Sequence, residues 1–228
     1  MKANNKHNLD RVVGVSVFSA LAFIVALVCN VIPEVAGFLS IDAKDSVISI
    51  ASFIYGPVSG ILIALIAALV EFLTFSTTGW YGLIMNFASS AVFAMTAALI
   101  YKFKRTVNGA LIGFFCAVIA TTGVMLLLNN FVTPLYLEYM VGLPRELAVQ
   151  TVIDYLPTVL LPFNAAKALM NAAIAMVLYK PVLLALSRAR LLNGKKPSFT
   201  FNKSTVVILI VGAICLAGAI TVFLVLPS

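Results

Sequence analysis

The chain has 228 residues, of which 62% are hydrophobic and only 10% are charged. A soluble domain of this length cannot bury that much apolar surface, so the composition excludes a water-soluble protein and predicts an all-α integral membrane protein. The net charge of +7 follows from membrane topology, as argued below, and requires no nucleic-acid partner.

Hydropathy and helix-breaking residues divide the chain into seven apolar segments. In chain order we expect helices at Val12–Ile32, Ser46–Tyr55, Val58–Phe75, Tyr81–Phe103, Ala110–Asn129, Leu156–Leu186 and Val206–Leu226. The second is too short to cross a hydrocarbon core of about 30 Å at about 1.5 Å per residue. Because Gly56 and Pro57 then turn the chain, we interpret it as a helix that starts inside the membrane from an intruding loop.

The same pattern predicts the organisation of the chain. We expect a transmembrane domain at residues 1–190, a basic cytoplasmic linker at 191–205 and an additional transmembrane helix at 206–228. No cleavable signal peptide is evident, since the first apolar segment is not followed by a small-residue cleavage site. The three cysteines each lie alone in an apolar segment, which suits neither a metal site nor a disulfide framework.

The basic residues predict the orientation of the chain. If the N-terminus is cytoplasmic and the seven segments alternate, 12 of the 15 lysines and arginines fall on the cytoplasmic side. Only Lys44, Arg145 and Lys167 remain outside or in the membrane, whereas six of the eight acidic residues are external. The sequence therefore predicts a multi-pass protein of the cell membrane with a cytoplasmic N-terminus.

Three polar residues share one face of the sixth segment. At about 100° per residue, Asn164, Lys167 and Asn171 lie within about 60° of one another. Lys167 is about eleven residues into this segment, hence about 16 Å deep, where a lysine costs roughly 2.5 to 3.5 kcal/mol. We therefore expect a functional role or a buried partner for Lys167, rather than a side chain that merely reaches back to the interface.

Further polar residues lie in the outer half of other segments. Glu71 is near the outer end of the third segment, Asn86 near the start of the fourth and Asn129 at the end of the fifth. Their shared depth predicts a cavity that opens outward, with Lys167 near its floor and the loop Pro33–Asp45 as its lid. We expect a few of the outer aromatic residues to enclose a planar ligand; the candidates are Trp80, Tyr81, Phe87, Phe131, Tyr136, Tyr139, Tyr155 and Phe163.

Motifs for several enzyme classes are absent. The sequence holds neither GxxxxGK[ST] nor HExxH, and its one histidine, His7, is in the N-terminal tail. We therefore expect no P-loop ATP site, no metal site and no enzymatic activity. Two minor alternatives stay open: an intramembrane enzyme that uses Glu71 with Lys167, and a channel or proton-coupled carrier with this pair as its relay.

Four stretches together resemble the riboflavin-binding S components of energy-coupling factor (ECF) transporters, over roughly Val12 to Leu186. They are FLSIDAKDSVISIASFIYGPVSGILIALIAALVEFL, MNFASSAVFAMTAALIYKFKRT, LLNNFVTPLYL and LPFNAAKALMNAAIAMVLYKP. The stretch from IDAKD to GPVSG is typical of S components in general. The NNFVTPLY and LPFNAAK stretches single out the riboflavin members.

The resemblance implies a six-helix S-component bundle that binds riboflavin from outside and docks on a membrane coupling subunit driven by two cytoplasmic ATPases. Riboflavin would then be a transported ligand, no cofactor would be needed, and ATP would be bound only by the partner subunits. The segment Val206–Leu226 is an extra helix beyond the usual bundle.

The resemblance also implies roles for single residues. Asn129, Asn164 and Lys167 would hydrogen-bond the ligand, and Ala22 with Ala26 would face the coupling subunit. The residues expected to help enclose the ligand are Asn86, Leu39, Ser40, Ile41 and Asp42, to which we add Glu71, a departure from the family pattern. An S component for another vitamin (pantothenate, folate or vitamin B6) and a solitary secondary carrier remain alternatives, because pockets on one fold vary their side chains freely.

Overall fold

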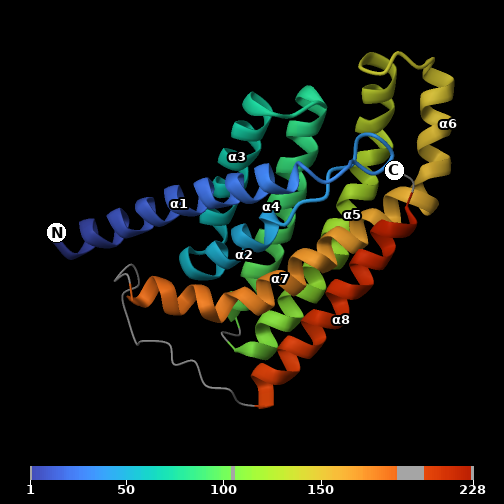
Figure 1. The fold of residues 1–228 in the computed structure, drawn as a ribbon. Coiled ribbons are helices and arrows are strands. Elements are labelled where there is room, and N and C mark those ends of the chain that lie inside the picture. The colour runs from blue at the N-terminus through green and yellow to red at the C-terminus, as the bar shows by residue number, and fades with distance from the viewer. Residues whose placement is uncertain (1, 104–105, 189–202, 227–228) are drawn as a thin grey trace.

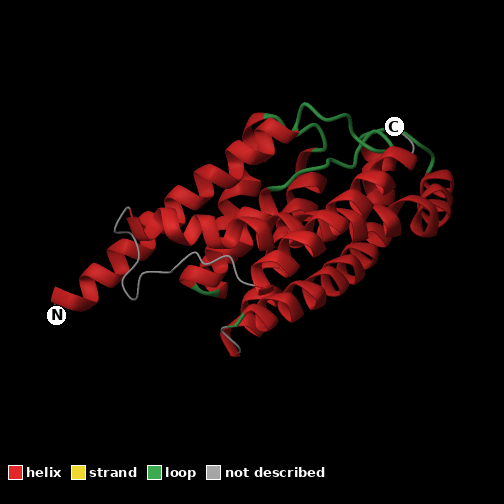
Figure 2. Ribbon diagram, turned by 60° about the horizontal axis from the view of Figure 1, so that its bottom comes forward, coloured by secondary structure: helices red, strands yellow, loops and turns green. Residues whose placement is uncertain are grey.

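The computed structural model describes residues 2–103, 106–188 and 203–226, and all regular secondary structure in these ranges is helical (Figure 1 and Figure 2). The basic linker expected at 191–205 falls almost wholly outside the described residues, and the division into domains stays a prediction. In chain order the elements are α1 (Lys2–Cys29), α2 (Lys44–Tyr55), α3 (Pro57–Thr74), α4 (Gly79–Phe103), α5 (Val107–Tyr139), α6 (Arg145–Tyr155), a π-helical turn (Leu156–Leu160), α7 (Leu161–Arg188) and α8 (Lys203–Val225).

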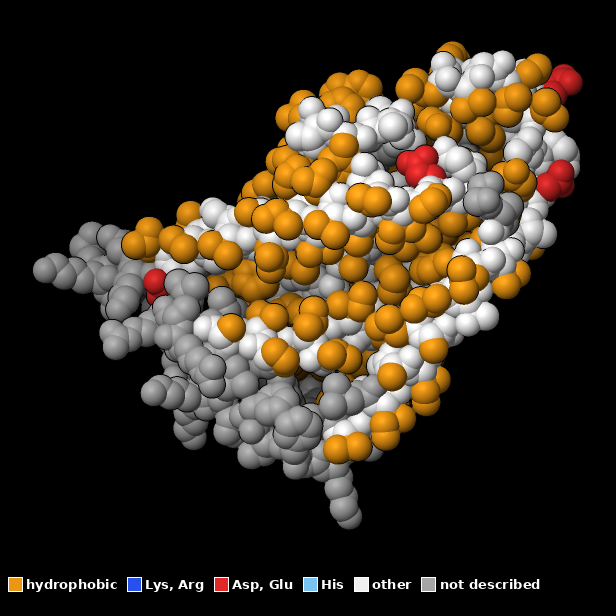
Figure 3. All heavy atoms as spheres, in the orientation of Figure 1, with side chains coloured by type: hydrophobic (Ala, Val, Ile, Leu, Met, Phe, Trp, Pro, Cys, Tyr) orange, Lys and Arg blue, Asp and Glu red, His pale blue; other side chains and the backbone are white. Residues whose placement is uncertain are grey.

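The helices have the length and the surface of membrane-spanning elements. Within the described ranges, five stretches are long and apolar enough to cross a bilayer: Leu9–Cys29, Pro57–Thr74, Gly79–Phe103, Asn108–Tyr139 and Arg145–Tyr179. α8 adds a shorter apolar stretch, Ile210–Val225. Figure 3 shows hydrophobic side chains spread over the described part of one face, with a few acidic side chains and no basic ones. An all-α, multi-pass membrane protein is therefore confirmed.

α2 is short and ends in a sharp turn, as predicted. It has 12 residues, well below the roughly 20 needed to span a bilayer. Gly56 follows it with a φ of 95°, in the left-handed region that favours glycine. Pro57 is the first residue of α3, a position where its missing N–H costs no hydrogen bond. Every residue from Lys44 to Ser52 is buried, so α2 begins inside the bundle rather than at its surface.

Two boundaries expected between residues 129 and 161 are wrong. α5 does not end at Asn129 but continues to Tyr139, past an internal proline at Pro134. The single helix expected at Leu156–Leu186 is preceded by α6 and starts with the π-helical turn, in which the Leu161 N–H donates to the Leu156 carbonyl. Polar residues in α6 and at the end of α5 interrupt the apolar runs, so hydropathy alone does not find these helices.

α8 lies along α7, where small side chains let the two helices approach. Ala219 of α8 is buried against Ala166 of α7. At Gly212 a Cβ atom would lie 3.1 Å from Val177 Cγ2, closer than most Cβ contacts, so a larger residue here would require Val177 to shift. Close approach through small residues is a main source of helix association in lipid. The helix expected at Val206–Leu226 is thus present and packed on the bundle.

The core of the bundle is built around the contact of α4 with α5. Its buried members include Phe93, Ala97 and Phe114. At Gly113 of α5, a Cβ atom would lie 2.8 Å from the Ala97 carbonyl oxygen, closer than Cβ atoms come to other atoms in proteins. Gly123, also on α5, has nothing within 4 Å of such a Cβ position.

We expect Gly113→Ala to destabilise the protein, because the added methyl group must push α4 and α5 apart. Overpacking of this kind costs about 1 to 3 kcal/mol. Gly123→Ala is the matched control, since the same change on the same helix meets open space. Thermal unfolding of both purified variants in detergent tests this, and equal midpoints would show that the α4–α5 contact tolerates a Cβ.

Candidate functional site

A cavity opens at the end of the bundle that carries the long loop between α1 and α2. It encloses about 640 Å³ of space between atoms, including its mouth. Its walls come from this loop and from α4, α5 and α7. The lining residues are Phe38, Leu39, Ser40, Thr78, Tyr81, Gly82, Met85, Asn86, Ser89, Met125, Asn129, Val132, Thr133, Tyr136, Phe163, Asn164 and Lys167.

The loop at residues 30–43, which we call the lid, folds over this cavity. At its tip, Val35 and Leu39 exchange two backbone hydrogen bonds of 3.0 Å each across a tight turn. Ala36 and Gly37 supply the positive φ angles of that turn, 52° and 76°. The ring of Phe38 then packs against Tyr136 of α5, with 5.8 Å between ring centroids. The lid expected from sequence is therefore an ordered turn with apolar anchors.

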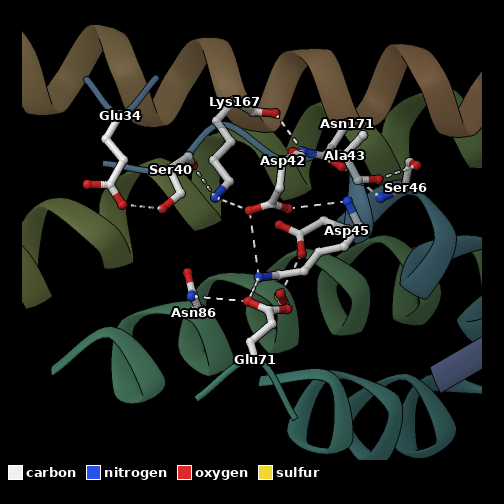
Figure 4. Close-up of polar contacts among 12 residues, drawn as sticks. Glu34, Ser40, Asp42, Ala43, Asp45, Ser46, Glu71, Asn86, Lys167 and Asn171 are labelled. Atoms are coloured by element: carbon white, nitrogen blue, oxygen red, sulfur yellow. Dashed lines mark hydrogen bonds and ion pairs between the residues drawn. The ribbon is translucent and has the colours of Figure 1, made fainter. Parts of the chain in front are cut away.

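Lys167 of α7 holds the base of the lid. Its Nζ donates to Asp42 Oδ2 at 2.6 Å and to the Ser40 carbonyl oxygen at 3.0 Å (Figure 4). Only 8% of Lys167 is exposed, so the expected buried partner exists, and it is Asp42. Lys167 lies in the second turn of α7, directly after the π-helical turn, and its depth in the membrane stays a prediction.

Lys44, the first residue of α2, is part of the same network, and sequence reasoning missed it. Its Nζ lies 2.6 Å from Glu71 Oε2 and 3.6 Å from Asp42 Oδ2, and only 2% of the residue is exposed. Glu71 Oε2 also accepts from Asn86 Nδ2 at 3.3 Å. Glu71 and Lys167 thus have different partners. The pair that a proton relay or an intramembrane enzyme would use is not formed.

The network holds one more carboxylate than amines. Asp42, Asp45 and Glu71 face the amines of Lys44 and Lys167, and all five residues are buried. Asp45 Oδ1 accepts a hydrogen bond from the hydroxyl of Ser90, which is buried on α4. Glu71 Oε1 is buried with no hydrogen-bond partner in the described part of the chain. It is therefore an acceptor available to a ligand or to water.

Asp42 is held in its charged form. Burial by itself raises the pKa of this carboxyl, but the attraction of Lys167 and then of Lys44 outweighs burial and lowers the pKa from 3.8 to about 2. Because the folded pKa lies below the unfolded one, the carboxylate stabilises the fold above about pH 4. That contribution is lost as the pH falls towards 2. Asp42 therefore stays ionised at any physiological pH.

The three buried asparagines of α5 and α7 are of two kinds. Asn171 fastens the start of α2, since its Nδ2 donates to the Asp42 carbonyl at 2.9 Å and its Oδ1 accepts from the Ser46 N–H at 2.8 Å. Asn129 and Asn164 line the cavity instead. Each donates one Nδ2 hydrogen to the carbonyl one turn earlier in its own helix, at 2.7 Å, which leaves the second hydrogen for a ligand.

Six of the nine expected ligand-binding residues line the cavity, namely Leu39, Ser40, Asn86, Asn129, Asn164 and Lys167. The other three, Ile41, Asp42 and Glu71, line an adjoining polar cleft that shares Ser40, Thr78 and Asn86 with the cavity. Of the aromatic candidates, Tyr81, Tyr136 and Phe163 line the cavity, whereas Trp80, Phe131 and Tyr139 are exposed.

Ala22 and Ala26 do not present a free surface. They are 0% and 4% exposed, and Ala22 belongs to the central core of the bundle. Neither side chain is therefore exposed in the isolated chain, and their role in docking stays a prediction. Within Leu9–Cys29 of α1, the exposed small residues are Ser16 and Ala20, centred about 120° around the helix from Ala22 and Ala26.

Comparison with known proteins identifies the family. The model of the family described as "ECF transporter, substrate-specific component" matches residues 10–179. This chain belongs to that family. The match covers α2 to α6, most of α1 and α7, and every residue that lines the cavity.

Relatives and a solved structure agree with this assignment. The chain is 33% identical over 182 residues to "Riboflavin transporter RibU" of Staphylococcus aureus (strain TCH60), covering 78% of this chain and 93% of that protein. It is 24% identical to "Riboflavin transporter FmnP" of Bacillus subtilis (strain 168), covering 75% and 90%. A solved S component of a bacterial ECF transporter superposes with a TM-score of 0.64 at 31% identity, covering 79% of this chain and 99% of the solved chain.

We expect Asp42→Asn to destabilise this S component strongly in the absence of ligand. The change removes the shared partner of two buried lysines, and breaking a buried ion pair costs on the order of 3 kcal/mol. Glu138→Gln is the control, because it removes the pair of Glu138 with Arg145, which is 62% exposed and worth about 0 to 1 kcal/mol. Thermal unfolding of both variants compares the two effects. A fall in midpoint no larger for Asp42→Asn than for Glu138→Gln would contradict the importance of the network.

Proposed function

We propose that this chain captures riboflavin in the cavity beneath the lid and delivers it inward when docked on an ATP-driven ECF module. The observation that carries the proposal is the composition of the cavity wall. Aromatic and apolar side chains, among them Tyr81, Tyr136 and Phe163, suit the faces of a flat tricyclic ring. Amide and amine groups of Asn129, Asn164 and Lys167 suit its polar edge. The relatives named riboflavin transporters support the same ligand.

The hydrogen-bonding groups that the fold leaves unused indicate how each residue would contact the ligand. Asn129 and Asn164 each offer one Nδ2 hydrogen to the ring, and Lys167 offers the Nζ hydrogen not used by Asp42 and Ser40. Glu71 Oε1, in the adjoining cleft, offers an acceptor to the hydroxyls of the ribityl chain. Leu39, Ile41 and Asp42 belong to the lid. They would shape it or hold it in place, and would not hydrogen-bond the ligand.

The proposed orientation of the chain would open the cavity to the outside of the cell. The cavity is at the end of the bundle where the lid lies, and the N-terminus is at the opposite end (Figure 1). With the cytoplasmic N-terminus that the basic residues indicate, riboflavin enters from outside. Release inward requires the coupling subunit and the two ATPases, since the sequence holds no nucleotide-binding motif of its own.

We expect Asn129→Ala to weaken riboflavin binding, because a buried hydrogen bond to the ring is lost. The cost of about 1 to 3 kcal/mol corresponds to roughly one to two decades in Kd. Asn130→Ala is a matched control, since the neighbouring side chain is exposed on the outer side of α5. Titration of riboflavin fluorescence with each purified variant measures both affinities. Unchanged affinity in Asn129→Ala would remove this residue from the binding site.

Docking on the coupling subunit is proposed for the exposed face of α1. Small residues let a partner helix approach closely in lipid, and Ser16 with Ala20 are the small residues exposed there. Replacing both with leucine should prevent co-purification with the coupling subunit and leave riboflavin affinity unchanged.

The contrasting double variant is Ala22→Leu with Ala26→Leu. Because Ala22 is in the core, these leucines should lower the thermal stability of the isolated protein before any partner is added. Normal co-purification of the Ser16→Leu, Ala20→Leu variant would show that the docking surface lies elsewhere.

A further inference from the structure

The C-terminal helix α8 lies outside the region that the family model describes, yet it touches the lid. The family match ends at residue 179, whereas α8 begins at Lys203. In Figure 1 and Figure 2, the end of α8 lies beside the loop that joins α1 to α2. α8 is therefore an addition to the S-component bundle that reaches the mouth of the ligand cavity.

The contact between α8 and the lid is apolar. Phe223 and Leu226 pack against a buried cluster that contains Val35 at the lid tip. Phe223 and Ile41, which is near the lid base, both pack against a second buried cluster formed by α7 and α8. Val35 is only 4% exposed, although it lies in a loop. The last two turns of α8 thus help to bury both ends of the lid.

The same helix braces a wall of the cavity. The ring of Phe223 packs on Phe163 of α7, with 5.8 Å between centroids, and Phe163 lines the cavity. Phe163 and Val35 belong to one buried cluster, so the wall and the lid share their support from α8.

The lid has two kinds of anchor that differ in strength. Its base is fixed by charged and polar groups, through Lys167 to Ser40 and Asp42 and through Asn171 to the Asp42 carbonyl. Its tip is held by apolar packing, on one side by Phe38 against Tyr136 and on the other by Phe223 and Leu226. The tip is therefore the part of the lid that can open, and α8 supplies one of its two holds.

We propose that α8 is a retention helix: its residue Phe223, with Leu226 directly after the helix, keeps the lid closed over the bound ligand and slows its release. This role rests on the proposed binding of riboflavin in the cavity. Phe223 and Leu226 are positioning residues, since they touch the lid and the wall but do not line the cavity.

The test uses the full-length double variant Phe223→Ala, Leu226→Ala. We expect riboflavin to dissociate about tenfold faster in stopped-flow measurements, because a lid that has lost one of its two holds at the tip opens more often. Val225→Ala is the matched control, since Val225 is on the same turn of α8 and 81% exposed. Gly113→Ala is the second control: it lowers stability without touching the lid and should leave the release rate unchanged. The conservative variant Phe223→Leu should keep release near the wild-type rate.

A second readout needs no ligand. Hydrogen exchange in the ligand-free double variant should be faster at the amides of residues 34–42 than in Val225→Ala, and unchanged in α4. Exchange and release rates that match those of Val225→Ala would overturn the proposal, and so would faster exchange with unchanged release. If the wild-type protein bound no riboflavin, the proposed ligand would fail, while the exchange arm would still decide whether α8 holds the lid.

Discussion

The buried carboxylate of Asp42 is the constraint on which the rest of the site depends. It is shared by Lys167 of α7 and Lys44 of α2, and its backbone carbonyl is bound by Asn171. These contacts join two helices to one loop residue, and Lys44 extends the network to Glu71 of α3. In a low-dielectric bundle, charges of this kind are tolerable only when each has its partner, so the network tolerates few alternative arrangements of the loop. A loop that would otherwise leave the bundle is thereby folded into it.

The cavity follows from this arrangement. With its base fixed at Ser40 and Asp42, the lid must turn back at Ala36 and Gly37, which brings Phe38 over the space between α4, α5 and α7. The polar groups of α5 and α7 then face that space from below. Placing a lysine inside the membrane costs free energy, but Lys167 both neutralises Asp42 and directs an N–H hydrogen at the cavity. The structural role of Lys167 and its proposed ligand-binding role therefore fall on one side chain.

The sequence predicted the features that depend on hydropathy or local pattern, and it failed where tertiary contacts decide. The short α2, the turn at Gly56, the polar face of α7 and the extra helix α8 were all predictable, because each leaves a local signal. α6 was not, because its polar residues give no apolar run. Lys44 was left outside or in the membrane without a role, because counting charges on loops cannot tell a solvated loop from one folded into the bundle. Ala22 and Ala26 have helical spacing, but spacing does not say which neighbour they face; Ala22 belongs to the chain's own core, and the docking role of the pair stays a prediction.

The central claim is that the cavity under the lid selects riboflavin, and a competitive titration of the purified, ligand-free protein tests it most directly. Riboflavin, pantothenate, folate and pyridoxine would each be added under the same conditions, with binding followed by calorimetry. The account predicts one riboflavin bound per chain and no measurable binding of the other three vitamins. Binding of another vitamin in preference to riboflavin, or of none of them by a folded protein, would contradict it.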